Sequence, residues 1–315
     1  MYAGRGTLLN VYLLSVILGI VEGLTEFLPV SSTAHLRIVE ALLHVPLDAS
    51  ACHVADLTCR GDAEYWKMYT IVIQAGAILA LTFLYLGKIL DFMRTFPRGE
   101  RGDRNIFTHP ISLTIWAFGC TSVIALALKK WSDRNLGSLT AMAVALLVGG
   151  VIMWVVDAWA SRFEPNTTHT EEISFAQAIW IGICQSTAAI FPGVSRSMST
   201  IAAGQLVSMD RPTALDFSFL LSIPTMFAAT AYDLVKEIHP SKSARAAGVV
   251  AAHVTMTGER WIVLAIGFVV SFIVAWGVVE WFLAWVRKHG FTAFAIYRIV
   301  LGIALLIWGA KIAGL

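Results

Sequence analysis

The chain contains few charged residues for its length. Only 14% of its 315 residues are Asp, Glu, Lys or Arg, whereas about 25% is usual in soluble proteins. Hydrophobic residues make up 57% of the chain, and the mean hydropathy is +0.71. This scarcity of charge excludes an ordinary soluble domain. It predicts an all-α polytopic membrane protein.

Positive charge is also too scarce for a nucleic-acid-binding protein. The net charge is only +2, and the basic residues lie in short clusters between apolar runs rather than on one face. No nucleic-acid partner is therefore expected. The apolar N-terminal stretch is similar to a signal peptide, but Glu22 and Glu26 follow where a small-residue cleavage site would lie. We expect this segment to be retained.

Six apolar runs approach the roughly 20 residues that span a bilayer. They lie at about 68–86, 111–128, 138–160, 213–235, 261–286 and 293–313. No stretch between them is long enough for a soluble domain. Residues 1–315 are therefore predicted to form a single integral membrane domain.

Two similar motifs occur in the apolar sequence, at Gly19–His35 (GIVEGLTEFLPVSSTAH) and at Gly182–Met198 (GICQSTAAIFPGVSRSM). A single offset of 163 residues superposes Gly19 on Gly182, Ile20 on Ile183, Pro29 on Pro192 and Ser32 on Ser195. Thr33 then falls opposite Arg196. The chain is predicted to consist of two related halves, at about 8–160 and 175–313.

Each motif interrupts an apolar stretch with proline and serine, and only a short apolar piece follows it. Broken helices at membrane depth are tolerated only where their free backbone groups face protein or a wet cavity. Both motifs are therefore predicted to form re-entrant helical hairpins. Together with six spanning helices they give about ten helices, five in each half. Because each half then crosses the membrane an odd number of times, the predicted architecture is an inverted-topology repeat.

The orientation in the membrane follows from the basic loops. Counting crossings places 88–109, 161–174, 209–212 and 287–292 on one side. The first of these loops is the richest in arginine and lysine, which predicts that this side is cytoplasmic.

Glu22 and Glu26 are spaced i and i+4, which places both carboxylates on one face of a helix. Two ionised carboxylates in a low dielectric need a cation, a shared proton or a water-filled cavity. The alternative is that they lie at the membrane interface and solvate a helix end. An ionisable residue inside a membrane is by default a functional candidate.

Ser31, Ser32 and Thr33 precede a short apolar piece and could serve as its N-cap. The same position offers backbone N–H groups and the positive end of a helix dipole to a phosphate. His35 follows Ser32 by three residues, close enough to act as a base or to hold a water molecule.

Arg196 is a guanidinium in apolar sequence, flanked by Ser195 and Ser197. Its fork suits bidentate binding of phosphate, and the alternative role is a structural ion pair with a glutamate. Gln74 and Gln185 could contact the substrate or hold helices together by hydrogen bonds.

In these motifs the chain resembles the BacA (UppP) family of undecaprenyl-diphosphate phosphatases. The matching stretches are EGLTEFLPVSSTAHL, VIQAGAILA, PGVSRS, FSFLLSIPTM and FAIYRI, and because the last lies near the C-terminus the match extends over almost the whole chain. The resemblance implies a membrane hydrolase that removes the terminal phosphate of undecaprenyl diphosphate. The product is the lipid carrier of peptidoglycan synthesis, and the reaction confers resistance to bacitracin.

The resemblance also assigns roles to individual residues. Glu22 and Glu26 are expected to hold a divalent cation, Mg²⁺ or Ca²⁺, and Arg196 to bind phosphate together with the serine-rich turns. Ser32 is expected to attack, or to position the attacking water, while His35 handles the proton.

The expected partners are the lipid substrate and the bilayer, with a homodimer as a further candidate. The resemblance implies the bacterial inner membrane and a site open to the periplasm. A lipid flippase is the alternative function, because inverted repeats with broken helices are also typical of alternating-access transporters.

Cys52 and Cys59 share the segment between Leu47 and Tyr65 with His53 and Asp56. These four residues match no strong zinc pattern. The topology places the segment in the oxidising periplasm, which favours a disulfide between the two cysteines.

Overall fold

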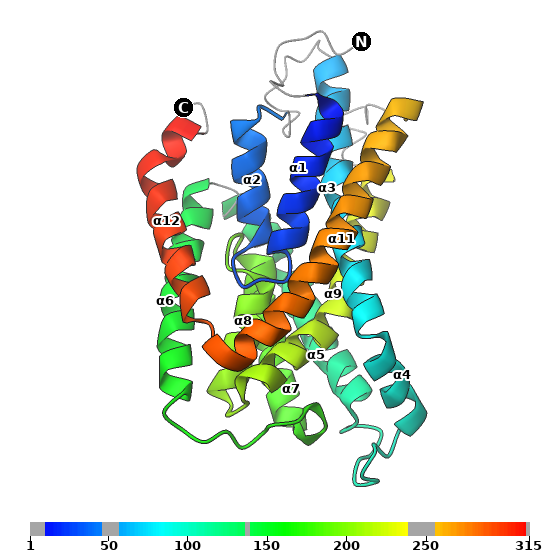
Figure 1. The fold of residues 1–315 in the computed structure, drawn as a ribbon, viewed down its shortest axis with the longest axis vertical. Helices are drawn as coiled ribbons and strands as arrows, with labels where there is room; N and C mark the ends of the chain where they lie inside the picture. Colours follow the sequence, from blue (N-terminus) through cyan, green and yellow to red (C-terminus); the bar gives the residue numbers. More distant parts are fainter. Residues whose placement is uncertain (1–9, 46–56, 136–138, 239–255, 313–315) are drawn as a thin grey trace.

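The chain forms a helical bundle in the computed structural model, which describes residues 10–45, 57–135, 139–238 and 256–312 (Figure 1). The described residues contain 11 α-helices, a short 3₁₀ helix and no strand. The helices are α1 (Val11–Thr25), α2 (Ser32–Leu42), α3 (Leu57–Leu84), α4 (Leu86–Thr95), α5 (Pro110–Asn135), α6 (Leu139–Ala160), η1 (Thr170–Glu172), α7 (Phe175–Ile190), α8 (Arg196–Leu206), α9 (Arg211–Ile238), α11 (Gly258–His289) and α12 (Thr292–Ile312). The all-α prediction is confirmed.

Six helices are long and apolar enough to cross a membrane. These segments are Asp62–Leu84, Pro110–Lys129, Leu139–Ala160, Arg211–Val235, Gly258–His289 and Thr292–Gly309. Each overlaps one of the six predicted runs. The prediction of a multi-pass membrane protein is therefore confirmed.

One helix was not predicted. Residues 88–109 were expected to be a loop because of their charges, but the first part of this segment belongs to α4. Ile89 and Phe92, three residues apart, pack on the main hydrophobic core and give this short helix an apolar face. Lys88 of the same helix donates to Asp216 of α9 at 2.7 Å.

Four short helices form the two predicted hairpins, α1 with α2 and α7 with α8. They enter from opposite ends of the bundle, and their turns meet in its interior (Figure 1). Each returning helix begins after a serine with positive φ, 73° at Ser31 and 71° at Ser195. This backbone conformation is uncommon for residues other than glycine, and its occurrence at both turns shows that the two turns are built alike.

The helix bounds correct the alignment of the two motifs. Helices α2 and α8 are the same length and begin 164 residues apart, so Ser31 corresponds to Ser195 and Ser32 to Arg196. The predicted pairing of Ser32 with Ser195 and of Thr33 with Arg196 is therefore wrong by one position. The first turn comprises residues 26–31, and the second comprises residues 191–195. Gly193, with φ 96°, fits there because an added Cβ would lie 2.7 Å from the carbonyl oxygen of Met142.

Helix packing between the halves is reciprocal. Helix α1 packs against α11, α7 packs against α5, and the pairs α6 with α12 and α3 with α9 join the halves. Gly19 of α1 allows close approach to α11, where an added Cβ would lie 2.8 Å from the carbonyl oxygen of Gly267. Gly182 does the same against Ala117 of α5. This exchange of partners is the arrangement expected of two related halves.

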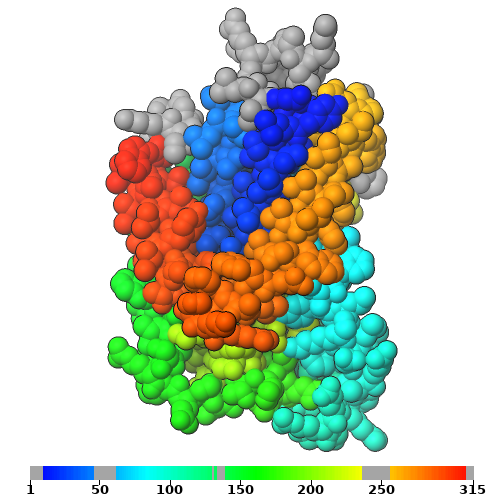
Figure 2. Space-filling view, in the orientation of Figure 1, coloured from blue at the N-terminus to red at the C-terminus, as the bar shows by residue number. Residues whose placement is uncertain are grey.

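The longest helix, α11, has 32 residues and runs obliquely across the bundle (Figure 1). The space-filling view shows α1 and α2 at the surface between α12 on one side and α11 on the other (Figure 2). Leu13 and Leu24 of α1 are among the exposed large hydrophobic residues.

Candidate active site

The carboxylate of Glu26 joins the two hairpins. Glu26 lies directly after the last residue of α1 and is buried. Its Oε2 accepts a 2.5 Å hydrogen bond from the Ser32 hydroxyl, and its Oε1 lies 3.5 Å from Nη2 of Arg196. Ser32 and Arg196 are the first residues of α2 and α8. One carboxylate thus contacts the leading residue of both returning helices.

Arg196 keeps most of its hydrogen-bonding capacity. Its side chain is 12% exposed, and Cζ lies 5.7 Å from the centre of the Phe27 ring. Nε, Nη1 and Nη2 are buried and make no hydrogen bond within the described residues. The ion pair with a glutamate that was the alternative role of Arg196 is present, but buried donors without acceptors are costly. This arrangement therefore favours an additional, anionic partner.

Glu22 lies one turn before Glu26, with only 1% of its surface exposed. Neither of its carboxylate oxygens has a hydrogen-bond partner in the described part of the chain. The alternative that Glu22 solvates a helix end at the membrane interface is therefore wrong. An unpartnered buried carboxylate requires a proton or a cation.

The donor set suits a hard divalent cation only in part. Among the described residues, no group of three or more His, Cys, Asp or Glu side chains could hold a metal ion. Glu22 and Glu26 offer two carboxylates, and Mg²⁺ commonly takes only one or two from the protein and the rest from substrate phosphate and water. The two residues fit a metal bound together with a phosphorylated substrate.

His35 is bonded to residues other than Ser32. Its Nδ1 lies 2.8 Å from the carbonyl oxygen of Ser31, and its Nε2 lies 2.6 Å from the hydroxyl of Tyr297. Because a carbonyl only accepts, Nδ1 carries a proton, and in the neutral ring Nε2 accepts from Tyr297. The rings also stack, with centroids 5.6 Å apart. Both ring nitrogens of His35 are thus engaged by residues other than Ser32, and this arrangement does not support the expected transfer of the Ser32 proton to His35.

The other predicted serine and threonine residues differ in their hydrogen-bond partners and in their burial. Ser195 caps α8 by accepting from the Met198 N–H at 3.4 Å, as the capping interpretation requires. Ser197 donates to the carbonyl of Leu28 at 3.0 Å and so links the two turns. Ser31 is buried at the start of α2 without a side-chain capping bond, and Thr33 is exposed.

The two glutamines differ in their surroundings. Gln185 donates from Nε2 to the hydroxyls of Thr121 and Thr225, both at 3.0 Å, so it connects α7 to α5 and α9. The helix-packing interpretation is confirmed for this residue. Gln74 is half-buried on α3, one turn after Thr70, whose hydroxyl lies 3.5 Å from Glu40 of α2.

Arg298 belongs to the site but was not predicted. This α12 residue is 0% exposed and donates to the carbonyls of Pro29, Gly193 and Val194, which lie in the two turns, and to that of Ala145. An arginine within the apolar stretch FAIYRI is the signal that could have identified it. Tyr297, the partner of His35, is its neighbour in the same stretch.

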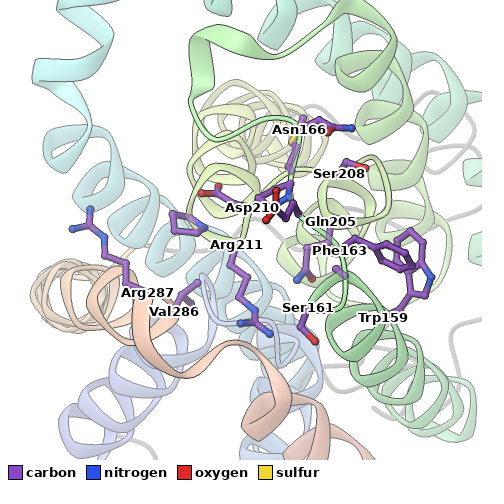
Figure 3. A pocket seen from close by; sticks show the side chains of 15 residues that line it. Trp159, Ser161, Phe163, Asn166, Gln205, Ser208, Asp210, Arg211, Val286 and Arg287 are labelled. Carbon is purple, nitrogen blue, oxygen red and sulfur yellow. The ribbon is translucent and has the colours of Figure 1, made fainter.

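A cavity of about 530 Å³ lies away from this site (Figure 3). It is lined by the end of α6, the start of α9 and the end of α11, and includes Arg211 and Arg287. Beside it, buried Asp157 accepts from Nε of Arg211 at 2.7 Å and from Gln205 at 2.9 Å. None of the predicted site residues lines this cavity.

Two of the four cysteines can be placed. Cys120 and Cys184 are free and half-buried. Cys52 lies outside the described residues, so its disulfide with Cys59 stays a prediction.

Fold and contacts together indicate an integral membrane protein of the hydrolase class, because a serine, a buried carboxylate that accepts a hydrogen bond from its hydroxyl, and a guanidinium meet between two broken helices. Within this class, the chain belongs to the bacitracin resistance protein BacA family, whose sequence model matches residues 15–304.

Three relatives show how far the similarity extends, and each is named Undecaprenyl-diphosphatase. The one from Koribacter versatilis (strain Ellin345) is 53% identical over 304 residues, which are 96% of this chain and 100% of the relative. The one from Rhizobium etli (strain CIAT 652) is 39% identical over 296 residues, 94% of this chain and 96% of the relative. The one from Caldanaerobacter subterraneus subsp. tengcongensis is 36% identical over 291 residues, 92% and 93% of the two chains.

Proposed function

We propose that this protein hydrolyses undecaprenyl diphosphate to undecaprenyl phosphate and inorganic phosphate. The family and the names of the relatives support this reaction. The observation that carries it is the carboxylate of Glu26, which lies between the hydroxyl of Ser32 and the guanidinium of Arg196. A nucleophile with its base and a phosphate-binding cation is what phosphoryl transfer requires.

In the proposed mechanism, Glu26 is the proton acceptor for Ser32. As the proton moves to Glu26, the Ser32 oxygen forms a bond to the terminal phosphorus. The bond from that phosphorus to the bridging oxygen breaks, and undecaprenyl phosphate leaves with the proton that Glu26 returns to that oxygen. Water then attacks the phosphoserine and gives one proton to Glu26, which passes it to the Ser32 oxygen as the bond from that oxygen to phosphorus breaks and inorganic phosphate departs. Arg196 and the N–H groups at the start of α2 and α8 stabilise the negative charge on the phosphoryl oxygens.

His35 acts as a support for the first turn in this proposal. Replacement of its partner, Tyr297→Phe, removes one hydrogen bond but keeps the stacked ring. A neutral hydrogen bond contributes about 0.5–1.5 kcal/mol, so turnover is expected to fall about threefold to tenfold. Steady-state phosphate release measures this, with Tyr12→Phe, a distant tyrosine, as the control. A loss as large as that of a Ser32 variant would instead make Tyr297 part of the proton path.

Glu22 and Glu26 would hold the divalent cation, which supplies charge neutralisation of the diphosphate oxygens. Glu22→Gln is expected to raise the metal concentration needed for half-maximal activity at least tenfold, since loss of even an outer-sphere partner often weakens binding tenfold or more. The measurement is a Mg²⁺ and Ca²⁺ titration after chelation, at several lipid concentrations. Full activity of the parent protein in excess chelator would refute the metal and leave Glu22 as a proton carrier.

The proposed location is the bacterial inner membrane, with the site reached from the periplasm. The basic segment 88–109 lies at the end of the bundle opposite to α1 and α2, and a positive-inside orientation places that end in the cytoplasm (Figure 1). Recycling of the lipid carrier in the periplasmic leaflet supports peptidoglycan synthesis. It also removes the diphosphate lipid that bacitracin binds.

Phosphate release from undecaprenyl diphosphate by purified protein tests the function directly. The parent protein is expected to release phosphate, and Ser32→Ala is the matched variant without the hydroxyl. The flippase alternative predicts movement of the lipid between leaflets of a vesicle with no release of phosphate. The Ser32 to Glu26 hydrogen bond favours hydrolysis, because binding of a headgroup requires no activated nucleophile.

A further inference from the structure

We propose that Arg298 is a positioning residue, which sets the distance between the catalytic turns by binding their backbone carbonyls. This inference rests on the proposed function and adds to it a residue that does not touch the substrate. Its basis is the pattern of hydrogen bonds made by one buried guanidinium.

The two terminal nitrogens of Arg298 divide their contacts between the hairpins. Nη1 donates to the carbonyl of Pro29 in the first turn at 3.0 Å. Nη2 donates to the carbonyls of Gly193 at 3.2 Å and Val194 at 2.9 Å in the second turn. It also lies 3.3 Å from the carbonyl of Ala145 on α6. A single planar group therefore holds both turns against the α6–α12 pair.

The carbonyls need such a partner because the hairpins are broken helices. Breaking a helix frees carbonyl groups that water cannot reach in the bundle interior, and each unpaired one is costly. Arginine suits this task better than lysine, because its donors point in fixed directions from two separate nitrogens. A lysine ammonium at the same position has all its donors on one atom and cannot reach both turns with the same geometry.

Arg298 acts through the turns rather than on the substrate. Its side chain is completely buried, and both terminal nitrogens are occupied by carbonyls. Ser32 lies three residues after Pro29 of the first turn, and Arg196 lies two residues after Val194 of the second turn. Any change in the spacing of the turns therefore changes the distance between Glu26 and Arg196. Displacement of a catalytic group by about 1 Å can lower turnover on the order of 10²-fold.

Gly149 on α6 makes an independent test available. A Cβ at this position would overlap Nη2 of Arg298 and would lie 3.3 Å from its Cζ. Gly149→Ala is therefore expected to displace the guanidinium without altering Arg298 itself. Gly302 on α12 is the matched control, since an added Cβ there would meet the backbone of Leu147 at 2.8 Å, within the same helix pair but away from the guanidinium.

The experiment compares kcat, KM and thermal unfolding for the parent protein, Arg298→Lys, Gly149→Ala and Gly302→Ala. It includes the two double variants that combine Arg298→Lys with each glycine replacement. Arg298→Lys is expected to lower kcat about 10²-fold while KM changes less than about threefold, because substrate contacts remain and their alignment is lost. Gly149→Ala is expected to lower kcat in the parent but to have little further effect in the Arg298→Lys background. Gly302→Ala is expected to lower the unfolding temperature with the same effect on kcat in both backgrounds.

Two results would overturn the inference. One is an Arg298→Lys protein with parental kcat. The other is a loss of kcat that matches only the loss of folded protein, with additive effects of Gly149→Ala and Arg298→Lys. If Arg298→Lys does not fold, a parental kcat for folded Gly149→Ala would overturn it equally. Failure of the parent protein to release phosphate would contradict the proposed function instead, so the two failures are distinguishable.

Discussion

Replacement of Arg196 with alanine is expected to lower turnover of undecaprenyl diphosphate by a factor of about 10² or more, while the protein still folds. The guanidinium is buried beside Glu26, and its nitrogens make no hydrogen bond within the described residues. In the proposed mechanism its free donors bind the phosphoryl oxygens and stabilise their negative charge. Steady-state phosphate release and thermal unfolding in detergent measure the two effects.

The shape of the Arg196 side chain is expected to matter for phosphate binding as well as its charge. Arg196→Lys is expected to restore little activity, because an ammonium lacks the bidentate fork that fits phosphate. Arg94→Ala is the control, since Arg94 is an exposed arginine on α4 whose ion-pair partner is Asp91. Turnover of Arg196→Ala close to that of the parent would rule out a phosphate-binding role for this arginine.

Replacement of Glu26 with glutamine is expected to lower turnover about 10²- to 10⁴-fold, the usual range for loss of a general base. The amide keeps the size of the side chain but accepts no proton from Ser32, and it leaves Arg196 without its carboxylate partner. Added metal is not expected to restore turnover. In this respect the variant differs from Glu22→Gln, whose defect is expected to decrease at high metal concentration.

Glu40→Gln provides the comparison for this prediction. Glu40 is also a buried carboxylate of the first hairpin, but its contact is with Thr70 of α3. Its replacement is expected to leave turnover within a few-fold of the parent. Equal losses for both variants would mean that the proton of Ser32 does not go to Glu26 in particular.

Much of the fold could be predicted because its signals are local. A run of about 20 apolar residues is stable in a membrane as a spanning α-helix, so the six spanning helices were predicted correctly. Proline and serine in the two motifs likewise predicted the hairpins. Arg196 and Glu26 were singled out because charge in apolar sequence is costly, and the structure places them together.

The features of the site that the sequence did not predict depend on contacts between segments far apart in the chain. The role of Arg298 arises from two turns more than 100 residues away from it, and nothing in its own neighbourhood shows which carbonyls it binds. The assignment of the Ser32 proton to His35 followed their three-residue spacing, but Tyr297 takes the free ring nitrogen. The turns were misaligned by one residue because the offset of 163 that pairs Gly19 with Gly182 does not hold at α2 and α8, which begin 164 residues apart.

The oblique course of α11 has a consequence for how a lipid arrives. A helix of 32 residues is about 48 Å long, well above the roughly 30 Å hydrocarbon thickness of a bilayer, so α11 must tilt strongly to stay within it. Helices α1 and α2 occupy the surface between α11 and α12 (Figure 2), and Leu13 and Leu24 of α1 are exposed. If the proposed function is correct, we expect the headgroup of a diphosphate lipid to reach the first hairpin from between α11 and α12, within the plane of the membrane, while its long polyprenyl tail remains among the acyl chains.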